Sequence, residues 1–175
     1  MLPYRFSVKV EQEDLRRFNI YSFYHRPTGV LMTLIGVVMF CVAQYMFFSG
    51  KLELKDEVFT TLLSLVVVVY MPLTLAMRAK SAMLRNPVFS QPMHYSLEED
   101  GLHLSTDVDL GEGEERESSL LWKNIYKVVR TREELLIFSN QIHAFVIPMR
   151  DLGEKYSAIR EILQNKLEPY QMGRL

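Results

Sequence analysis

The sequence predicts an α+β protein in two parts: a transmembrane helical hairpin, followed by a small domain of antiparallel strands that ends in a helix. Two long stretches, residues 27–50 and 58–77, contain no charged residue. From residue 92 onward, short segments alternate between apolar and polar residues, which is typical of half-buried strands. The chain then closes on apolar residues at helical spacing.

Length and charge exclude several classes of protein. The chain has 175 residues, and its 20 basic and 21 acidic residues leave a net charge of -1. This balance gives no reason to expect a nucleic acid as partner. The single cysteine, Cys41, excludes an intrachain disulfide and a metal site built from several cysteines.

Each apolar stretch is long enough to cross a bilayer. At about 1.5 Å per residue, roughly 20 helical residues span a hydrocarbon core of about 30 Å. The alternative is a pair of buried core helices, but a chain of this length would struggle to wrap two such segments. Residues 51–57 alone connect the two stretches, so the predicted spans (residues 28–78) form a hairpin with both outer ends on one side.

Positive charge predicts the orientation of this hairpin. The connecting loop contains only Lys51 and Lys55, whereas more basic residues flank the outer ends: Arg16, Arg17, Arg26, Arg78, Lys80 and Arg85. Segments rich in lysine and arginine stay in the cytoplasm. We therefore expect a multi-pass protein of the plasma membrane with both termini in the cytoplasm.

Small residues recur at every seventh position of the first apolar stretch: Gly29, Gly36, Ala43 and Gly50. On a helix they form a strip that lets another helix approach closely. This strip predicts either packing between the two spans of one chain or a homodimer face.

The N-terminal segment, residues 1–27, predicts a short strand and then an amphipathic helix that leads into the membrane. Apolar residues alternate within residues 4–10, and the acids of residues 11–14 favour a helix start. We expect the strand to add to an edge of the C-terminal sheet, because a lone strand leaves its backbone groups without partners. The alternative is a disordered tail.

A basic linker, residues 79–91, leads to the C-terminal domain of residues 92–175, and Pro87 ends any continuation of the second span. In this domain, residues 93–97 and 102–104 predict a hairpin whose turn ends in Asp100-Gly101, with glycine at positive φ. Further strands are predicted within residues 118–122, 125–132, 134–139 and 142–147.

The predicted C-terminal helix begins with Asp151 as its cap and carries one apolar stripe: Leu152, Tyr156, Ile159, Leu163 and Leu167. About 80 residues can enclose a modest core. We therefore expect residues 90–175 to fold without the rest of the chain.

Several stretches of the chain resemble the YcxB-like family of small bacterial membrane proteins with two spans and a pleckstrin-homology-like (PH-like) C-terminal domain. They are Tyr95-x-Leu97 with Glu98-Glu99-Asp100-Gly101-Leu102, Leu121-Trp122-Lys123-x-Ile125-x-Lys127-Val128, Leu135-x-Ile137-Phe138, and Phe145-x-Ile147-Pro148-x-Arg150. The resemblance implies a partly open β-barrel capped by the C-terminal helix, and no established activity. The acidic stretch of residues 107–117 is longer than the resemblance leads us to expect.

The sequence predicts no catalytic, cofactor-binding or metal-binding residues. The acidic stretch begins like a calcium loop but lacks the later ligands of that motif. His94 and His103 lie on adjacent predicted strands, where we expect solvated side chains, because no third metal ligand accompanies them. Trp122 is predicted to anchor the core or a sheet edge, and the alternative is a platform for a stacked ligand.

One basic group is a candidate contact with the anionic inner leaflet: Lys127, Arg130 and Arg132. Arg130 and Arg132 share a face of a predicted strand. An ordinary solvated strand face is the alternative.

These observations favour a non-enzymatic integral membrane protein whose cytoplasmic domain binds or scaffolds an unidentified protein partner. The alternative is a small membrane transport or bacteriocin-tolerance component that acts as a homo-oligomer through the small-residue strip and Gln44. An enzyme is the least favoured class, because the titratable residues form no visible cluster.

Overall fold

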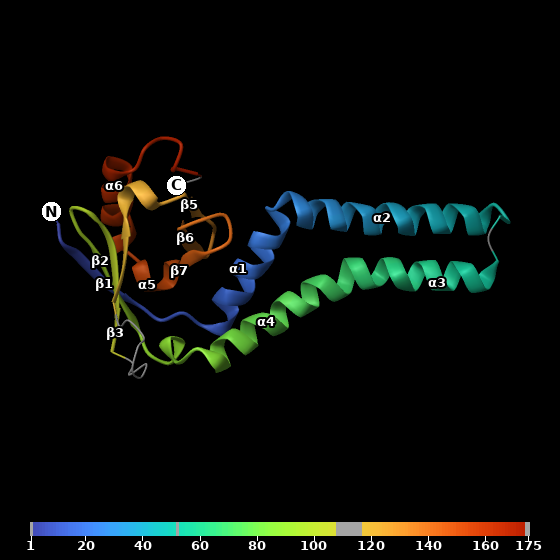
Figure 1. Ribbon diagram of the computed structural model, residues 1–175, viewed down its shortest axis with the longest axis horizontal. Helices are drawn as coiled ribbons and strands as arrows, with labels where there is room; N and C mark the ends of the chain where they lie inside the picture. Colours follow the sequence, from blue (N-terminus) through green and yellow to red (C-terminus); the bar gives the residue numbers. More distant parts are fainter. Residues whose placement is uncertain (1, 52, 108–116, 174–175) are drawn as a thin grey trace. The chain divides into compact units, whose positions relative to one another are not determined.

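A computed structural model describes residues 2–51, 53–107 and 117–173 (Figure 1). The chain forms two compact units. One is helical and comprises Arg16–Ser81, and the other combines Met1–Leu15 with Ala82–Leu175. Most of the acidic stretch predicted as a loop, residues 108–116, lies outside the described residues.

The helical unit contains two long apolar helices. The first, α2 (Pro27–Phe48), follows α1 (Gln12–Tyr24) in the chain. The second comprises α3 (Leu54–Leu65), a π-helical turn η1 (Val66–Tyr70) and α4 (Met71–Arg85). The π-helical turn lies directly before Pro72, whose nitrogen has no hydrogen to donate to the helix.

Local sequence explains where these helices begin and end. Pro27 stands in the first turn of α2, where its missing N–H would have no partner inside the helix. Gly50 follows the other end with φ +68°, and the Lys51 N–H donates to Met46 O at 2.9 Å. Gly50 therefore closes α2 and is no part of its packing strip. α4 ends at Arg85, just before the Asn86-Pro87 bond.

The two long helices of this hairpin pack on each other through small and polar residues. Gly29, Gly36 and Ala43 are the buried residues described in α2, and Ser64 is the one described in α3. Within the most apolar windows of the two long helices, 11% and 7% of residues are buried. Both helices are long and apolar enough to cross a membrane, and few of the described residues in their most apolar parts are buried, unlike those of a core helix.

The other unit contains two antiparallel sheets. The first has the order β1 (Tyr4–Val8), β2 (Met93–Leu97), β3 (Gly101–Thr106) and β4 (Glu117–Leu121). The second has the order β5 (Lys127–Arg130), β6 (Glu134–Phe138) and β7 (Ala144–Pro148). Short helices complete the unit: η2 (Pro87–Ser90), η3 (Trp122–Asn124), α5 (Met149–Leu152) and α6 (Lys155–Lys166). The sheets do not close into one barrel among the described residues.

The N-terminal strand pairs with β2, as predicted (Figure 1). Tyr4 lies opposite Leu97 and Val8 opposite Met93, so β1 forms one edge of the first sheet. The rings of Phe6 and Tyr95 stack with centroids 5.4 Å apart, and Phe145 of β7 meets Tyr95 edge-on. Burial raises the pKa of the Tyr95 hydroxyl.

One hydrophobic core joins both sheets and α6. Its buried members include Phe6, Val8, Val10, Met93, Leu97, Leu102, Val128, Leu135, Ile137, Ile147, Leu152, Ile159 and Leu163. The apolar stripe predicted for one C-terminal helix is confirmed in part. Tyr156, Ile159 and Leu163 lie on α6 and are buried or partly buried in this cluster, whereas Leu152 lies on α5 and Leu167 follows the end of α6. Three core residues come from the N-terminal segment, so the expectation that residues 90–175 fold alone is revised: β1 supplies part of their core.

Two local predictions are wrong. Gly101 has no positive φ. It is required because a Cβ there would lie 2.4 Å from Leu120 O, on the neighbouring strand. Asp151 lies inside α5 and accepts a hydrogen bond from the Lys9 N–H at 2.8 Å, so it caps no helix. α6 begins after Glu154, which makes no side-chain capping hydrogen bond.

Candidate functional site

The outer face of the first sheet is polar. In β2 the side chains of Met93, Tyr95 and Leu97 are buried, so strand alternation turns His94 and Ser96 to the other face. The register continues this polar face across all four strands. One cross-strand row contains Arg5, Ser96, His103 and Ser119, and the next contains Ser7, His94, Ser105 and Glu117.

This polar face is concave. It encloses a region of about 810 Å³, which these eight residues line together with Glu98, Ser118 and Lys155 of α6. Many of the side chains are short hydroxyls, which leave their strands accessible from outside. We call this surface the polar sheet face.

At one end of the polar sheet face, His94 connects two other side chains. Asp107 Oδ2 accepts from its Nε2 at 3.0 Å, and its Nδ1 lies 2.9 Å from the Ser7 hydroxyl oxygen. The order serine, histidine, aspartate resembles a hydrolytic triad. However, the Asp107 side chain is 76% exposed, whereas a triad uses a buried acid to orient its histidine.

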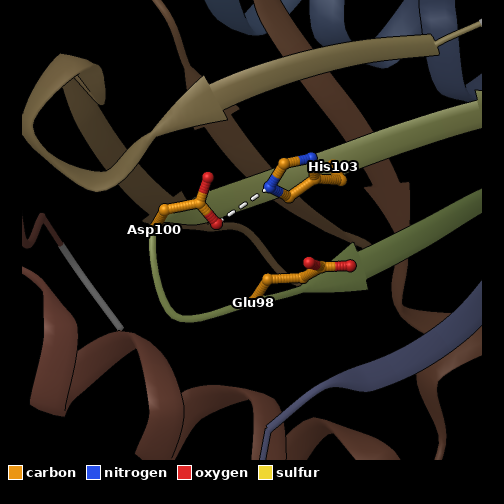
Figure 2. A group of neighbouring side chains, drawn as sticks. All are labelled: Glu98, Asp100 and His103. Carbon is orange, nitrogen blue, oxygen red and sulfur yellow. Dashed lines mark hydrogen bonds and ion pairs between the residues drawn. The ribbon is translucent and has the colours of Figure 1, made fainter.

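At the other end lies an acidic group at the β2–β3 hairpin, with Glu98 and Asp100 on the turn and His103 on β3 (Figure 2). His103 Nε2 donates to Asp100 Oδ1 at 3.0 Å, and this hydrogen bond lowers the pKa of Asp100 below its usual range. Ser96 Oγ donates to Glu98 Oε1 at 2.9 Å.

One ligand atom from each of Glu98, Asp100 and His103 lies within 4.8 Å of the other two. One nitrogen and two carboxylate oxygens form a donor set that zinc accepts when water completes its coordination. All three side chains are also at least partly exposed, so water satisfies them equally well without an ion.

Trp122 fixes the backbone under this acidic group. Its ring is buried, and its indole N–H lies 3.1 Å from both Glu98 O and Glu99 O. The prediction that Trp122 anchors the core or a sheet edge is therefore confirmed. The sequence places His94 and His103 on adjacent strands and predicts solvated side chains. In the structure each histidine has a different acidic partner, Asp107 for His94 and Asp100 for His103. The spacing of Asp100 and His103 around a turn was the signal that could have found this pair.

A second ionic group, which we call the joint, ties the N-terminal segment to α5. Arg150 donates from two nitrogens to the two carboxylate oxygens of Asp14, each at 2.8 Å, and also to Lys9 O at 2.9 Å. The Glu11 N–H donates to Asp14 Oδ2 at 2.7 Å. The hydrogen bond to Asp14 raises the pKa of Arg150. The joint therefore fixes the chain just beyond β1, the edge strand of the polar sheet face.

The three basic residues predicted as a membrane patch have different neighbours. Arg130 lies over the ring of Tyr156, with its guanidinium carbon 4.7 Å from the ring centroid. Arg132 Nε lies 3.6 Å from Glu133 Oε1. Lys127 instead lines a separate surface with Lys123, Tyr126 and Tyr170.

Comparisons with known proteins bear on part of this unit. No curated protein and no solved structure matches the chain. Residues 111–163, which include β4 to β7 and most of α6, match the family model described as YcxB-like protein. This match confirms, over that segment, that the chain is related to the YcxB-like family its motifs resemble.

Proposed function

We propose that this chain is a non-enzymatic membrane-anchored protein whose cytoplasmic PH-like domain binds a protein partner on the polar sheet face. The carrying observation is the concave surface of about 810 Å³, in which hydroxyl, imidazole and charged groups from four strands face outward. Strands and the joint hold these groups in place, so a partner meets hydrogen-bonding groups that are already oriented.

The membrane anchor is supported by two helices that are long, apolar and mostly exposed. Basic residues flank their outer ends, which favours a cytoplasmic position for the domain. Tethering confines the domain to the membrane surface and raises its effective concentration toward partners that are also bound there.

The geometry favours binding over transport through oligomerised spans. Gly29, Gly36 and Ala43 are already buried within one chain. The Gln44 amide donates to Glu57 Oε1 at 2.9 Å and to Thr61 Oγ1 at 3.0 Å, both on α3. These residues therefore already have neighbours within one chain, and Gly29 lies against Phe23 of α1.

Photocrosslinking from single positions in native membranes tests the proposal. A photoreactive phenylalanine analogue replaces Ser96 or Ser119 on the polar sheet face, and Gln164 on the exposed side of α6 serves as control. We expect a discrete protein adduct from the two sheet positions, and its loss when Arg5→Glu is added. The same adduct from Gln164, or no adduct from either sheet position, contradicts the proposal.

A reporter fused after residue 175 that is active only outside the cytoplasm tests the orientation separately. We expect no activity from this fusion, because we propose that both termini lie in the cytoplasm. An active fusion would place the polar sheet face on the opposite side of the membrane.

A further inference from the structure

Outside the helices, three large apolar side chains among the described residues are strongly exposed. Tyr126 is 49% exposed, Ile142 is 56% exposed and Tyr170 is 75% exposed. Isolated exposed apolar residues are ordinary on protein surfaces. Here Tyr126 and Tyr170, although far apart in the sequence, line the same concave surface of about 720 Å³.

Lysines accompany the two tyrosines. Lys123 and Lys127 line the same surface, and its other lining residues are uncharged: Asn124, Ile125, Ser139, Asn140 and Gln141. Ile142 lies in the loop that also contains Asn140 and Gln141. We call this surface the Tyr–Lys face. Its charged lining residues are all positive, although the whole chain has a net charge of -1.

Hydrogen bonds hold the backbone beneath both tyrosines. The Tyr126 N–H donates to Phe138 O at 2.8 Å. Gln171, which follows Tyr170, is 2% exposed, and its amide donates to Trp122 O at 2.9 Å. The Val128 N–H donates to Gln171 O at 2.7 Å, and the Gly173 N–H donates to Val128 O at 2.8 Å. The C-terminal segment is thus tied along β5 while the Tyr170 ring faces outward.

We propose that the Tyr–Lys face rests on the anionic surface of the bilayer. Tyrosine is favoured at the depth of lipid headgroups, because its ring is apolar and its hydroxyl is polar. Lysines beside it are attracted to anionic headgroups, and an exposed isoleucine can enter the interface. A bilayer is always near, because the same chain carries two helices that are long and apolar enough to cross it.

This assignment changes the composition of the predicted membrane patch. Lys127 remains in it, whereas Arg130 is engaged with the Tyr156 ring and Arg132 lies beside Glu133. Lys123, Tyr126 and Tyr170 take their place. The Tyr–Lys face shares no lining residue with the polar sheet face, so lipid contact leaves the latter open to a partner.

Fluorescence quenching in nanodiscs tests this placement with the full chain. Cys41→Ser removes the native thiol, and Gln141→Cys carries an environment-sensitive dye on the Tyr–Lys face. Gln164→Cys on α6 is the control. Brominated lipids quench dyes that reach the interface. We expect quenching at position 141 to be roughly twofold stronger in anionic phosphatidylglycerol than in neutral phosphatidylcholine, and weak quenching at position 164 in both.

Two variants separate charge from aromatic insertion. Lys123→Glu with Lys127→Glu should abolish the difference between anionic and neutral lipids. Tyr126→Ser with Tyr170→Ser should weaken quenching in both lipids. All four side chains are exposed, so an unchanged thermal transition of each variant confirms that it is folded.

Three outcomes of the quenching measurements overturn the proposal. They are equal quenching at positions 141 and 164, equal quenching in the two lipids, and a difference between the two lipids that persists after both lysines are reversed. A change in the emission of the dye at position 141 when polyglutamate is added in solution, without quenching by lipid, would assign the face to an acidic protein segment. That result would also overturn the proposal. None of these results bears on partner binding at the polar sheet face.

Discussion

The joint and the tip of the β2–β3 hairpin each contain an aspartate bonded to a basic side chain, but in different surroundings. At the joint, the Asp14 side chain is 0% exposed and both its oxygens accept from Arg150 at 2.8 Å. At the tip, Asp100 is 56% exposed and accepts one bond from His103 at 3.0 Å. The bond lengths are similar, so the two sites differ in burial and in the number of hydrogen bonds to the carboxylate.

Burial determines what each carboxylate contributes. The Asp14 side chain has no contact with solvent, although its partner Arg150 is 42% exposed, whereas the Asp100 side chain is itself exposed. Removing one partner of a buried ion pair is strongly destabilising, while exposed pairs contribute little. The joint therefore holds β1 in place, and the tip can exchange hydrogen bonds with a partner or an ion at little cost.

The largest effect is expected when the joint is removed with its strand. A fragment of residues 90–175 lacks Phe6, Val8 and Val10, which are core residues, and it lacks Asp14. We expect no cooperative thermal transition from this fragment. Without β1, the backbone groups along the edge of β2 lose their partners, and the core loses three buried side chains. Calorimetry measures the transition directly.

A peptide of residues 2–15 added in trans should restore the transition of the fragment. The same peptide with Phe6→Asp is the matched control and should not restore it. A cooperative transition of the fragment alone would show that β1 is an accessory to the fold.

Arg150→Ala tests the joint alone in the full chain. It leaves the Asp14 carboxylate buried with the Glu11 N–H as its remaining partner among these contacts. We expect the free energy of unfolding to fall by about 2 kcal/mol, because Asp14 loses charged hydrogen bonds while the arginine it loses is partly exposed, measured by chemical denaturation in detergent. Arg160→Ala, on the exposed side of α6, should change it by less than about 0.5 kcal/mol. Equal effects of the two substitutions would contradict the role of burial.

Much of the architecture could be predicted from local patterns. Alternation identified β2, and the spacing of Ile159 and Leu163 identified the buried stripe of α6. The two long helices followed from the absence of charge. The N-terminal strand was placed on the sheet by the need of its backbone groups for partners, and the register confirms this placement.

The joint and the Tyr–Lys face could not be predicted in the same way. Asp14 and Arg150 lie far apart in the sequence, and so do Tyr126 and Tyr170. Local periodicity contains no information about which distant residues meet. The same limit explains the wrong prediction for Gly101. The atom that excludes a side chain at this position, Leu120 O, belongs to another strand, so the local turn pattern does not reveal it.

The side chains at the tip of the β2–β3 hairpin are exposed, but its backbone can still be rigid. Gly101→Ala tests whether this backbone resists deformation as the joint does. A Cβ at position 101 would lie 2.4 Å from Leu120 O, which is a backbone atom. We expect a loss of about 1–3 kcal/mol in the free energy of unfolding, because the two strands must separate. Ser119→Ala, on the neighbouring strand with its side chain exposed, is the control and should be nearly neutral. A neutral Gly101→Ala would show that the tip is deformable in its backbone as well.

The smallest effect is expected from His103→Asn, which removes the partner of Asp100. The hydrogen bond to His103 lowers the pKa of Asp100 from its ordinary value of 3.8. A carboxyl whose pKa is lowered by folding stabilises the fold above its ordinary pKa, and loses that contribution as the pH falls through the lowered value. In a carboxyl-detected NMR titration, we expect the midpoint of Asp100 to rise toward 3.8 in the variant, with no measurable change in thermal stability at neutral pH. Glu98→Gln leaves the bond between Asp100 and His103 in place and should shift the midpoint of Asp100 less than His103→Asn does. An unchanged Asp100 midpoint in His103→Asn would mean that water already replaces this bond, and the contrast with Asp14 would then be one between a bonded carboxylate and a solvated one.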